Sequence, residues 1–180
     1  MSLKDAVAVV AGASRGCGRG IALALGDAGA IVYATGRTRR GGRMPADGAA
    51  GTIDDTAEEV TRRGGTGVAM SVDHTDPRQV EAPLLGRHRH HRRTAGLHED
   101  RALGMYLYTI GEEARAQFRY DLAETPEYAG RAVAALAADP ERLAKTGQLL
   151  HVADLAAEYG FTDVDGTRVG NFYRVLGLVP

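Results

Sequence analysis

Three glycines near the start of the chain have a spacing that suits phosphate binding. Gly12, Gly16 and Gly18 form G-x-x-x-G-x-G within GASRGCG. The first glycine permits a tight turn off a strand, the second removes a side chain where a diphosphate approaches, and the third lets a helix pack closely on a sheet. Amides at the start of that helix favour an anion. The turn predicts a dinucleotide site, with a purely structural turn as the alternative.

The segments on either side of this turn have the patterns of strands and a helix. Ala6 to Ala11 is an apolar run, typical of a strand buried on both faces of a parallel sheet. Arg19 to Ala28 has the broad apolar face of a helix, and Gly29 is placed to end it in a left-handed conformation. Ala30 to Thr35 predicts a second buried strand. Together they predict a βαβ unit.

Further along the chain, helical and strand patterns alternate again. Thr52 to Arg63 predicts a helix, and Gly67 to Val72 predicts a third strand. Asp76 and Pro77 have the residue types that open a helix. The last third of the chain predicts four more elements. The first two are a helix over 127–138 and a short helix ended by Gly147. A strand over Gln148 to Val152 and a helical turn over 154–159, closed by Gly160, follow. The predicted inward positions of the Thr52 to Arg63 helix are Ile53, Thr56, Ala57 and Val60.

The overall composition is that of an ordinary globular domain. The chain has 180 residues, of which 44% are hydrophobic and 25% charged, with a formal net charge of −1. This charge predicts no general attraction to nucleic acid or to membranes. The single cysteine, Cys17, favours a reducing compartment, and no run approaches the ~18 apolar residues of a membrane-spanning helix. We therefore expect a cytoplasmic protein.

Residues 6–37, AVAVVAGASRGCGRGIALALGDAGAIVYATGR, resemble the N-terminal unit of the short-chain dehydrogenase/reductase family. The resemblance continues through GTIDDTAEEVTRRGGTGVAMSVDHTD and resumes at TPEYAGRAVAALAADPERLAKTGQLLHVADLAAEYGFTDVDG, and so covers residues 4–82 and 125–166. It implies a Rossmann-like doubly wound parallel sheet, in a single α/β domain over residues 1–180. Residues 84–112 are poorly defined, and the region of the fourth strand is missing, so the sheet is expected to be incomplete in the middle and its open edge could favour a homo-oligomer.

The resemblance also implies a nicotinamide coenzyme and assigns residues to it. Members that prefer NAD carry an acid at the end of the second strand, where this chain has Gly36 followed by Arg37. Arginine pairs bidentately with phosphate, so we expect NADP(H), with NAD(H) as the alternative. A solvated arginine loop is the competing interpretation. The expected coenzyme-binding residues are Gly12, Ser14, Arg15, Gly16, Cys17, Gly18, Arg37 and Asp73.

The catalytic residues that the family implies are not intact. Members carry an asparagine, a serine and a Tyr-x-x-x-Lys pair, but no tyrosine of this chain is followed four residues later by lysine. The nearest counterparts are Tyr108, with Glu112 in the lysine position, and Thr94 for the serine. A carboxylate there would raise the tyrosine pKa, which opposes the required chemistry. We expect hydride transfer between nicotinamide and a small carbonyl or alcohol substrate to be impaired, and a non-catalytic nucleotide-binding protein is the alternative.

An arginine- and histidine-rich tract, RHRHHRR, occupies residues 87–93. Binding of a metal or a polyanion is one interpretation, but no cysteine or acid stands at ligand spacing and no aromatic residues accompany the tract, so neither a metal site nor a nucleic-acid partner is expected. A local frameshift with flanking deletions is a second hypothesis, because CGN arginine codons shifted by one base encode strand-forming residues. The nucleotide sequence would test this hypothesis.

Overall fold

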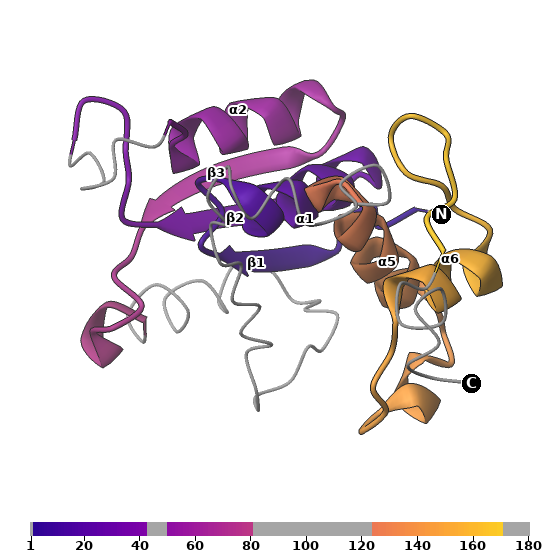
Figure 1. The fold of residues 1–180 in the computed structure, drawn as a ribbon. Helices are drawn as coiled ribbons and strands as arrows, with labels where there is room; N and C mark the ends of the chain where they lie inside the picture. The colour runs from indigo at the N-terminus through magenta and orange to yellow at the C-terminus, as the bar shows by residue number, and fades with distance from the viewer. Residues whose placement is uncertain (1, 43–49, 81–123, 171–180) are drawn as a thin grey trace, which may run out of the picture.

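The computed structural model describes residues 2–42, 50–80 and 124–170 (Figure 1). At its centre are three parallel strands, β1 (Val7–Ala11), β2 (Ile31–Gly36) and β3 (Thr66–Ser71), in the order β1-β2-β3. Neighbouring strands end level with each other, since Ala11 pairs with Thr35 and Thr35 pairs with Met70. This is the arrangement of one half of a doubly wound α/β sheet, so the predicted fold class is confirmed for these residues.

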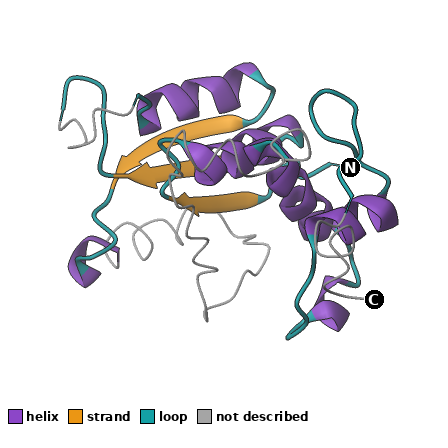
Figure 2. Ribbon diagram, in the orientation of Figure 1, coloured by secondary structure: helices purple, strands orange, loops and turns teal. Residues whose placement is uncertain are grey.

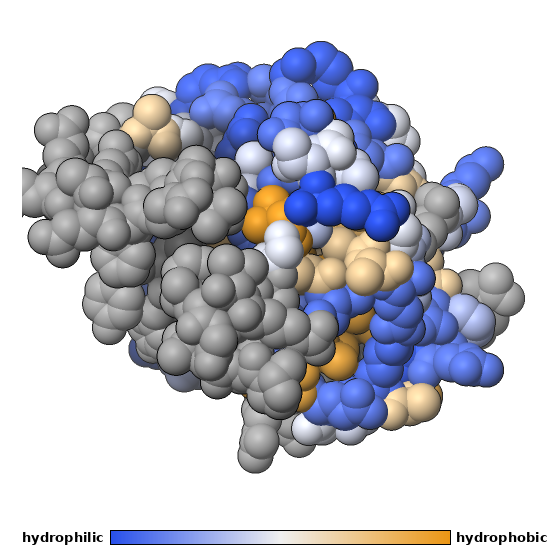
Figure 3. Space-filling model, turned by 45° about the vertical axis from the view of Figure 1, so that its right-hand side comes forward, coloured by the Kyte–Doolittle hydropathy of each residue, from blue (hydrophilic) through white to orange (hydrophobic). Residues whose placement is uncertain are grey.

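Helices α1 (Gly16–Asp27) and α2 (Ile53–Arg62) connect the strands and pack against the sheet and each other (Figure 2). The predicted inward face of α2 is confirmed, because Ile53, Thr56 and Val60 are fully buried. Its opposite side forms a hydrophilic surface at the top of the molecule (Figure 3). The core lies between these helices and the sheet, and its fully buried side chains include Leu23, Val32, Ile53 and Val60.

The C-terminal elements begin with α5 (Pro126–Ala138), followed by the 3-10 helix η2 (Arg142–Lys145) and by α6 (Val152–Tyr159). Helix α5 packs directly on α1 (Figure 1). At the crossing, a Cβ atom added to Gly130 would lie 2.6 Å from the carbonyl oxygen of Gly20. Glycine is therefore needed for the helices to approach this closely.

A buried carboxylate fixes the start of α5 to the loop that follows α6. Asp163 is only 3% exposed, and it accepts hydrogen bonds from the backbone amide and the hydroxyl of Thr125 and from the amide of Val164. Arg131 of α5 donates to the carbonyl oxygens of Thr162 and Asp163 in return. The Thr125–Asp163 bonds join residues 38 positions apart, and they tie the loop after α6 to the start of α5, which itself packs on α1.

Several local signals gave the predicted result. Gly29 and Gly160 follow α1 and α6 with φ of +87° and +75°, as a left-handed helix end requires. Asp76 opens a helical turn over 77–80 by accepting a hydrogen bond of 3.0 Å from the amide of Arg78.

Three predictions need correction. Helix α1 begins at Gly16 rather than Arg19, so the later glycines of the turn lie in its first turn. Strand β1 is not buried on both faces, because α1 packs on one face and Val9 is 48% exposed. Gln148 to Val152 do not form a strand. Leu149 is 86% exposed and no described strand lies beside it, so the segment lacks the partner that a strand needs.

At the α1–α5 crossing, packing and helix propensity predict opposite changes in stability for one substitution. Gly130→Ala would raise the helix propensity of α5, which alone stabilises by up to about 1 kcal/mol. The added methyl would meet the backbone of Gly20, however, and overpacking costs typically ~1–3 kcal/mol. We expect a net loss of stability, measured as a lower urea midpoint.

Gly42→Ala is the control, because a Cβ atom there would have only ordinary contacts with Arg39, the nearest at 3.4 Å. Its urea midpoint should stay close to that of the wild type. A Gly130→Ala protein that is more stable than the wild type would contradict the described crossing.

Candidate functional site

The glycine turn between β1 and α1 has the backbone geometry that its sequence predicts. Gly12 and Gly16 have φ of +70° and +54°, a region that residues with side chains rarely adopt. A Cβ atom on Gly18 would lie 2.4 Å from the carbonyl oxygen of Gly12. Gly12 therefore makes the tight turn and Gly18 allows the helix to approach the strand, as predicted.

The start of α1 lacks the side-chain partners that a helix start usually has. Its N-cap residue is Arg15, which makes no capping hydrogen bond, and no acidic residue stands in the first turn. Helix α2 is the opposite case. Its N-cap Thr52 accepts from the amide of Asp55, whose carboxylate accepts from the amide of Thr52 in return, and two acids stand in its first turn. Within the described residues, α2 therefore has a capping box at its start, whereas α1 has no side-chain cap.

Backbone and side-chain hydrogen bonds fix the turn to the neighbouring strand. The amide of Ala13 donates to the carbonyl oxygen of Thr35, at 3.0 Å. The Thr35 hydroxyl donates to the carbonyl oxygen of Val10, so it must accept from Nε2–H of His74, 2.8 Å away. Thr35 is 2% exposed and links the ends of all three strands.

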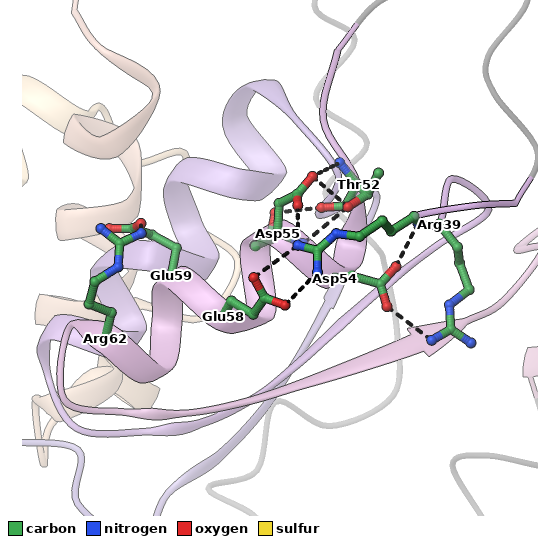
Figure 4. A network of polar contacts seen from close by, with 9 residues as sticks. Arg39, Thr52, Asp54, Asp55, Glu58, Glu59 and Arg62 are labelled. Atoms are coloured by element: carbon green, nitrogen blue, oxygen red, sulfur yellow. Dashed lines mark hydrogen bonds and ion pairs between the residues drawn. The ribbon is translucent and has the colours of Figure 1, made fainter.

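The loop after β2 separates its arginines into two groups. In the first group, Arg39 donates to Asp54 of α2 (Figure 4). The Arg40 guanidinium donates to Asp55 and Glu58 of the same helix. The arginine bonds hold the pKa of the Asp54 and Glu58 carboxyl groups below its ordinary value, and the Thr52 hydroxyl followed by Arg40 does the same for Asp55. Arg37 is exposed and has no ion pair with any residue that the structure describes. Of the described arginines here, it is the one whose guanidinium points to no carboxylate of α2.

The loop after β3 contains the third predicted position. One carboxylate oxygen of Asp73 accepts from the amide and the hydroxyl of Thr75, at 3.0 and 2.7 Å. Its own amide donates to the side chain of Gln79. Asp73 therefore shapes the turn that leads from β3 into the helical turn over 77–80.

The pKa of the Cys17 thiol depends on its surroundings at the start of α1. Burial raises the pKa of its thiol above the ordinary value of 9.0, and the negative charge of Glu124 raises it further. A helix N-terminus by itself would lower a thiol pKa. Desolvation and the nearby carboxylate both favour the protonated thiol, so Cys17 is protonated at neutral pH.

The structure brings all eight predicted coenzyme-binding residues to one edge of the sheet, where parallel strands β1, β2 and β3 end together. The predicted catalytic residues Tyr108 and Thr94, and the tract at 87–93, lie outside the described residues. Sequence reasoning did not assign roles to Thr35 and His74. A polar residue within a buried apolar strand was the available signal for Thr35.

No family model matches the chain. Among curated proteins, it is similar to dehydrogenase/reductase SDR family member 1 of Mus musculus, 41% identical over 56 residues, which are 31% of this chain and 18% of that protein. The human counterpart is 40% identical over 60 residues, 33% of this chain and 19% of that protein. The aligned part thus spans about a fifth of these relatives. Over about a third of its length, the chain is thus similar to members of the short-chain dehydrogenase/reductase family.

Solved structures of a reductase and of a short-chain dehydrogenase are also similar to the chain. The promiscuous reductase LugOII, which catalyses keto-reduction in lugdunomycin biosynthesis, is 27% identical with a TM-score of 0.37, covering 50% of this chain and 35% of LugOII. A short-chain dehydrogenase of Mycobacterium thermoresistibile is 22% identical with a TM-score of 0.46, covering 76% of this chain and 46% of that protein.

In residues 2–42, 50–80 and 124–170, no helix has the length and apolar character to cross a membrane. The same ranges hold no group of three or more histidine, cysteine, aspartate or glutamate side chains that could bind a metal ion.

The raised pKa of the Cys17 thiol gives a prediction that can be tested without any ligand. Because its pKa is raised, alkylation by iodoacetamide should be slow at pH 7 and should reach half its maximal rate only above pH 9, the ordinary value. Glu124→Gln removes a negative charge that disfavours the thiolate, so it should move this midpoint to lower pH. Cys17 is the only cysteine of the chain, so the reaction has one site.

Alkylation rates measured from pH 6 to pH 12 by mass spectrometry give both midpoints. A wild-type midpoint near pH 7, or one that rises in Glu124→Gln, would contradict the described surroundings of the thiol.

Proposed function

We propose that the chain binds a nicotinamide dinucleotide at the edge of the sheet where β1, β2 and β3 end. The observation that carries this proposal is the uncapped start of α1 directly after a glycine turn. The diphosphate would accept hydrogen bonds from the amides of Gly16, Cys17 and Gly18 and would meet the positive end of the helix. Family kinship supports the same ligand, because the family uses NAD(P)(H).

The residues present fit such a group. The two turn glycines with positive φ place backbone, rather than side chains, at the surface of the turn. Ser14 and Arg15 precede the helix, where a hydroxyl and a guanidinium would reach the phosphates. The bound coenzyme would supply the nicotinamide ring, which accepts or donates a hydride.

The preference for NADP(H) rests on Arg37. It follows Gly36 at the end of β2, where the adenosine ribose of a dinucleotide lies in doubly wound sheets. Arg39 and Arg40 are joined to acids of α2, whereas Arg37 has no such partner in the described residues. A guanidinium in this position suits a 2′-phosphate, which offers bidentate acceptors. Asp73, after β3, would accept from the adenine amino group as well as from Thr75.

The proposed reaction is hydride transfer between the nicotinamide and a small carbonyl or alcohol, with low turnover. The Tyr-x-x-x-Lys pair is absent from the sequence, and Tyr108 would have to act beside Glu112 rather than lysine. Lysine would favour the tyrosinate, whereas a carboxylate opposes it. We expect coenzyme binding to be retained and NADPH oxidation with simple ketones to be weak, with any residual rate lost in Tyr108→Phe.

Coenzyme preference can be tested with two neighbouring arginines. Arg37→Ala should raise the dissociation constant of NADP⁺ about tenfold, or ~1.4 kcal/mol, and should change that of NAD⁺ little, because only NADP⁺ carries the 2′-phosphate. Isothermal titration calorimetry measures both constants. Arg39→Ala is the matched control, because the Arg39 guanidinium is bonded to Asp54, at 2.9 Å.

The control should leave the ratio of the two constants unchanged. Equal losses for NADP⁺ and NAD⁺ in Arg37→Ala would argue against contact with a 2′-phosphate. Absence of heat with both coenzymes at millimolar concentration in the wild type would reject the proposed function itself.

A further inference from the structure

A threonine of α2, Thr56, is hydrogen-bonded to the backbone of the glycine turn. The Thr56 hydroxyl donates to the carbonyl oxygen of Ala13, at 2.7 Å, and shares its hydrogen with the carbonyl oxygen of Thr52, at 3.1 Å. The first bond joins residues 43 positions apart. Thr56 and Ala13 are both fully buried. Water cannot replace the hydroxyl there, so the Ala13 carbonyl depends on Thr56 for this bond.

Gly51 supports the next peptide group of the turn. A Cβ atom built on Gly51 would lie 2.5 Å from the carbonyl oxygen of Ser14 and 3.5 Å from Cβ of Arg15. Gly51 itself has φ of +114°, which also favours glycine. The backbone before α2 therefore lies directly against the carbonyl of Ser14.

These two contacts determine where the amides of the turn point. The described chain has no cis peptide bond, and in a trans peptide the C=O and N–H groups point in opposite directions. The carbonyls of Ala13 and Ser14 face Thr56 and Gly51. The amides that share those peptide planes, which belong to Ser14 and Arg15, therefore point away from α2.

We infer that Thr56 is a positioning residue for the proposed coenzyme site. Its hydroxyl holds the Ala13–Ser14 peptide in the orientation that presents the Ser14 amide, together with the first amides of α1, to a diphosphate. The amide of Ala13 is fixed separately by Thr35, so both polar groups of this residue are held by the protein. The inference rests on the proposed function, and it adds to that function a residue that touches no ligand.

The test compares three variants of α2 in the full chain. Thr56→Val keeps the shape and removes the hydroxyl, whereas Thr56→Ser keeps the hydroxyl. Thr61→Val is the control, because the Thr61 hydroxyl also bonds a helix carbonyl, that of Ala57, at 3.0 Å, but lies away from the turn. Calorimetry gives the NADP⁺ dissociation constant, and thermal unfolding gives the stability of each variant.

We expect Thr56→Val to weaken NADP⁺ binding about tenfold, the equivalent of ~1.4 kcal/mol, with Thr56→Ser and Thr61→Val within about twofold of the wild type. A merely structural role would lower the melting temperature of Thr56→Val and leave the affinity of the folded protein unchanged. Unchanged affinity in Thr56→Val therefore overturns the inference, whatever happens to its melting temperature.

Amide hydrogen exchange without coenzyme separates this inference from the proposed function. If the wild type binds no coenzyme, the proposed function is wrong, and exchange at residues 14–18 then decides the role of Thr56 alone. Faster exchange in Thr56→Val than in Thr61→Val supports its role in ordering the turn. Equal exchange in the two variants overturns that role.

Discussion

The amides at the start of α1 impose the constraint on which this site depends. The first four N–H groups of a helix have no partner within the helix, and polar groups without a partner are costly when water is excluded. In α2, the Thr52 side chain bonds the amide of Asp55, and the carbonyl oxygen of Thr38 bonds the amide of Ile53. Helix α1 begins with an arginine cap that makes no such bond, within the part of the chain that the structure describes. An anionic ligand is the partner that completes it in the proposed account.

The surrounding fold keeps these amides in place and accessible. Three parallel strands end level with one another, so the loops that follow them meet at one edge. Thr35 ties the turn to β2, and Thr56 ties it to α2. Helix α5 packs behind α1 through a glycine–glycine contact, and the buried Asp163 holds the start of α5 in turn. The glycine turn is therefore held by its neighbours, although the structure describes only three strands.

Sequence patterns predicted the elements that depend on interactions between residues close together in the chain. The buried face of α2 and the left-handed helix ends followed from periodicity and from glycine placement. The Gln148 to Val152 prediction was wrong because strand propensity describes the residues themselves, whereas a strand also needs a neighbour to bond with. The coenzyme role of the glycine turn stays a prediction, although its backbone geometry is the expected one.

The contacts that define the site were less accessible from sequence. Arg37, Arg39 and Arg40 look equivalent in the sequence, and only the fold places two of them against the acids of α2. Thr56 was predicted to face inward, but its bond to Ala13 spans 43 positions and no local pattern encodes that distance. Tertiary hydrogen bonds of this kind depend on how helices dock, which periodicity does not specify.

The central claim is that the first amides of α1 bind the diphosphate of a nicotinamide coenzyme. The most direct test is a titration of the ¹⁵N-labelled protein with NADP⁺, followed by amide NMR shifts. The account predicts saturable shifts at Ser14, Gly16, Cys17 and Gly18, with the amides of Asp54 and Asp55 at the capped start of α2 shifting far less. Unmoved resonances for the α1 amides at saturating NADP⁺ would contradict it.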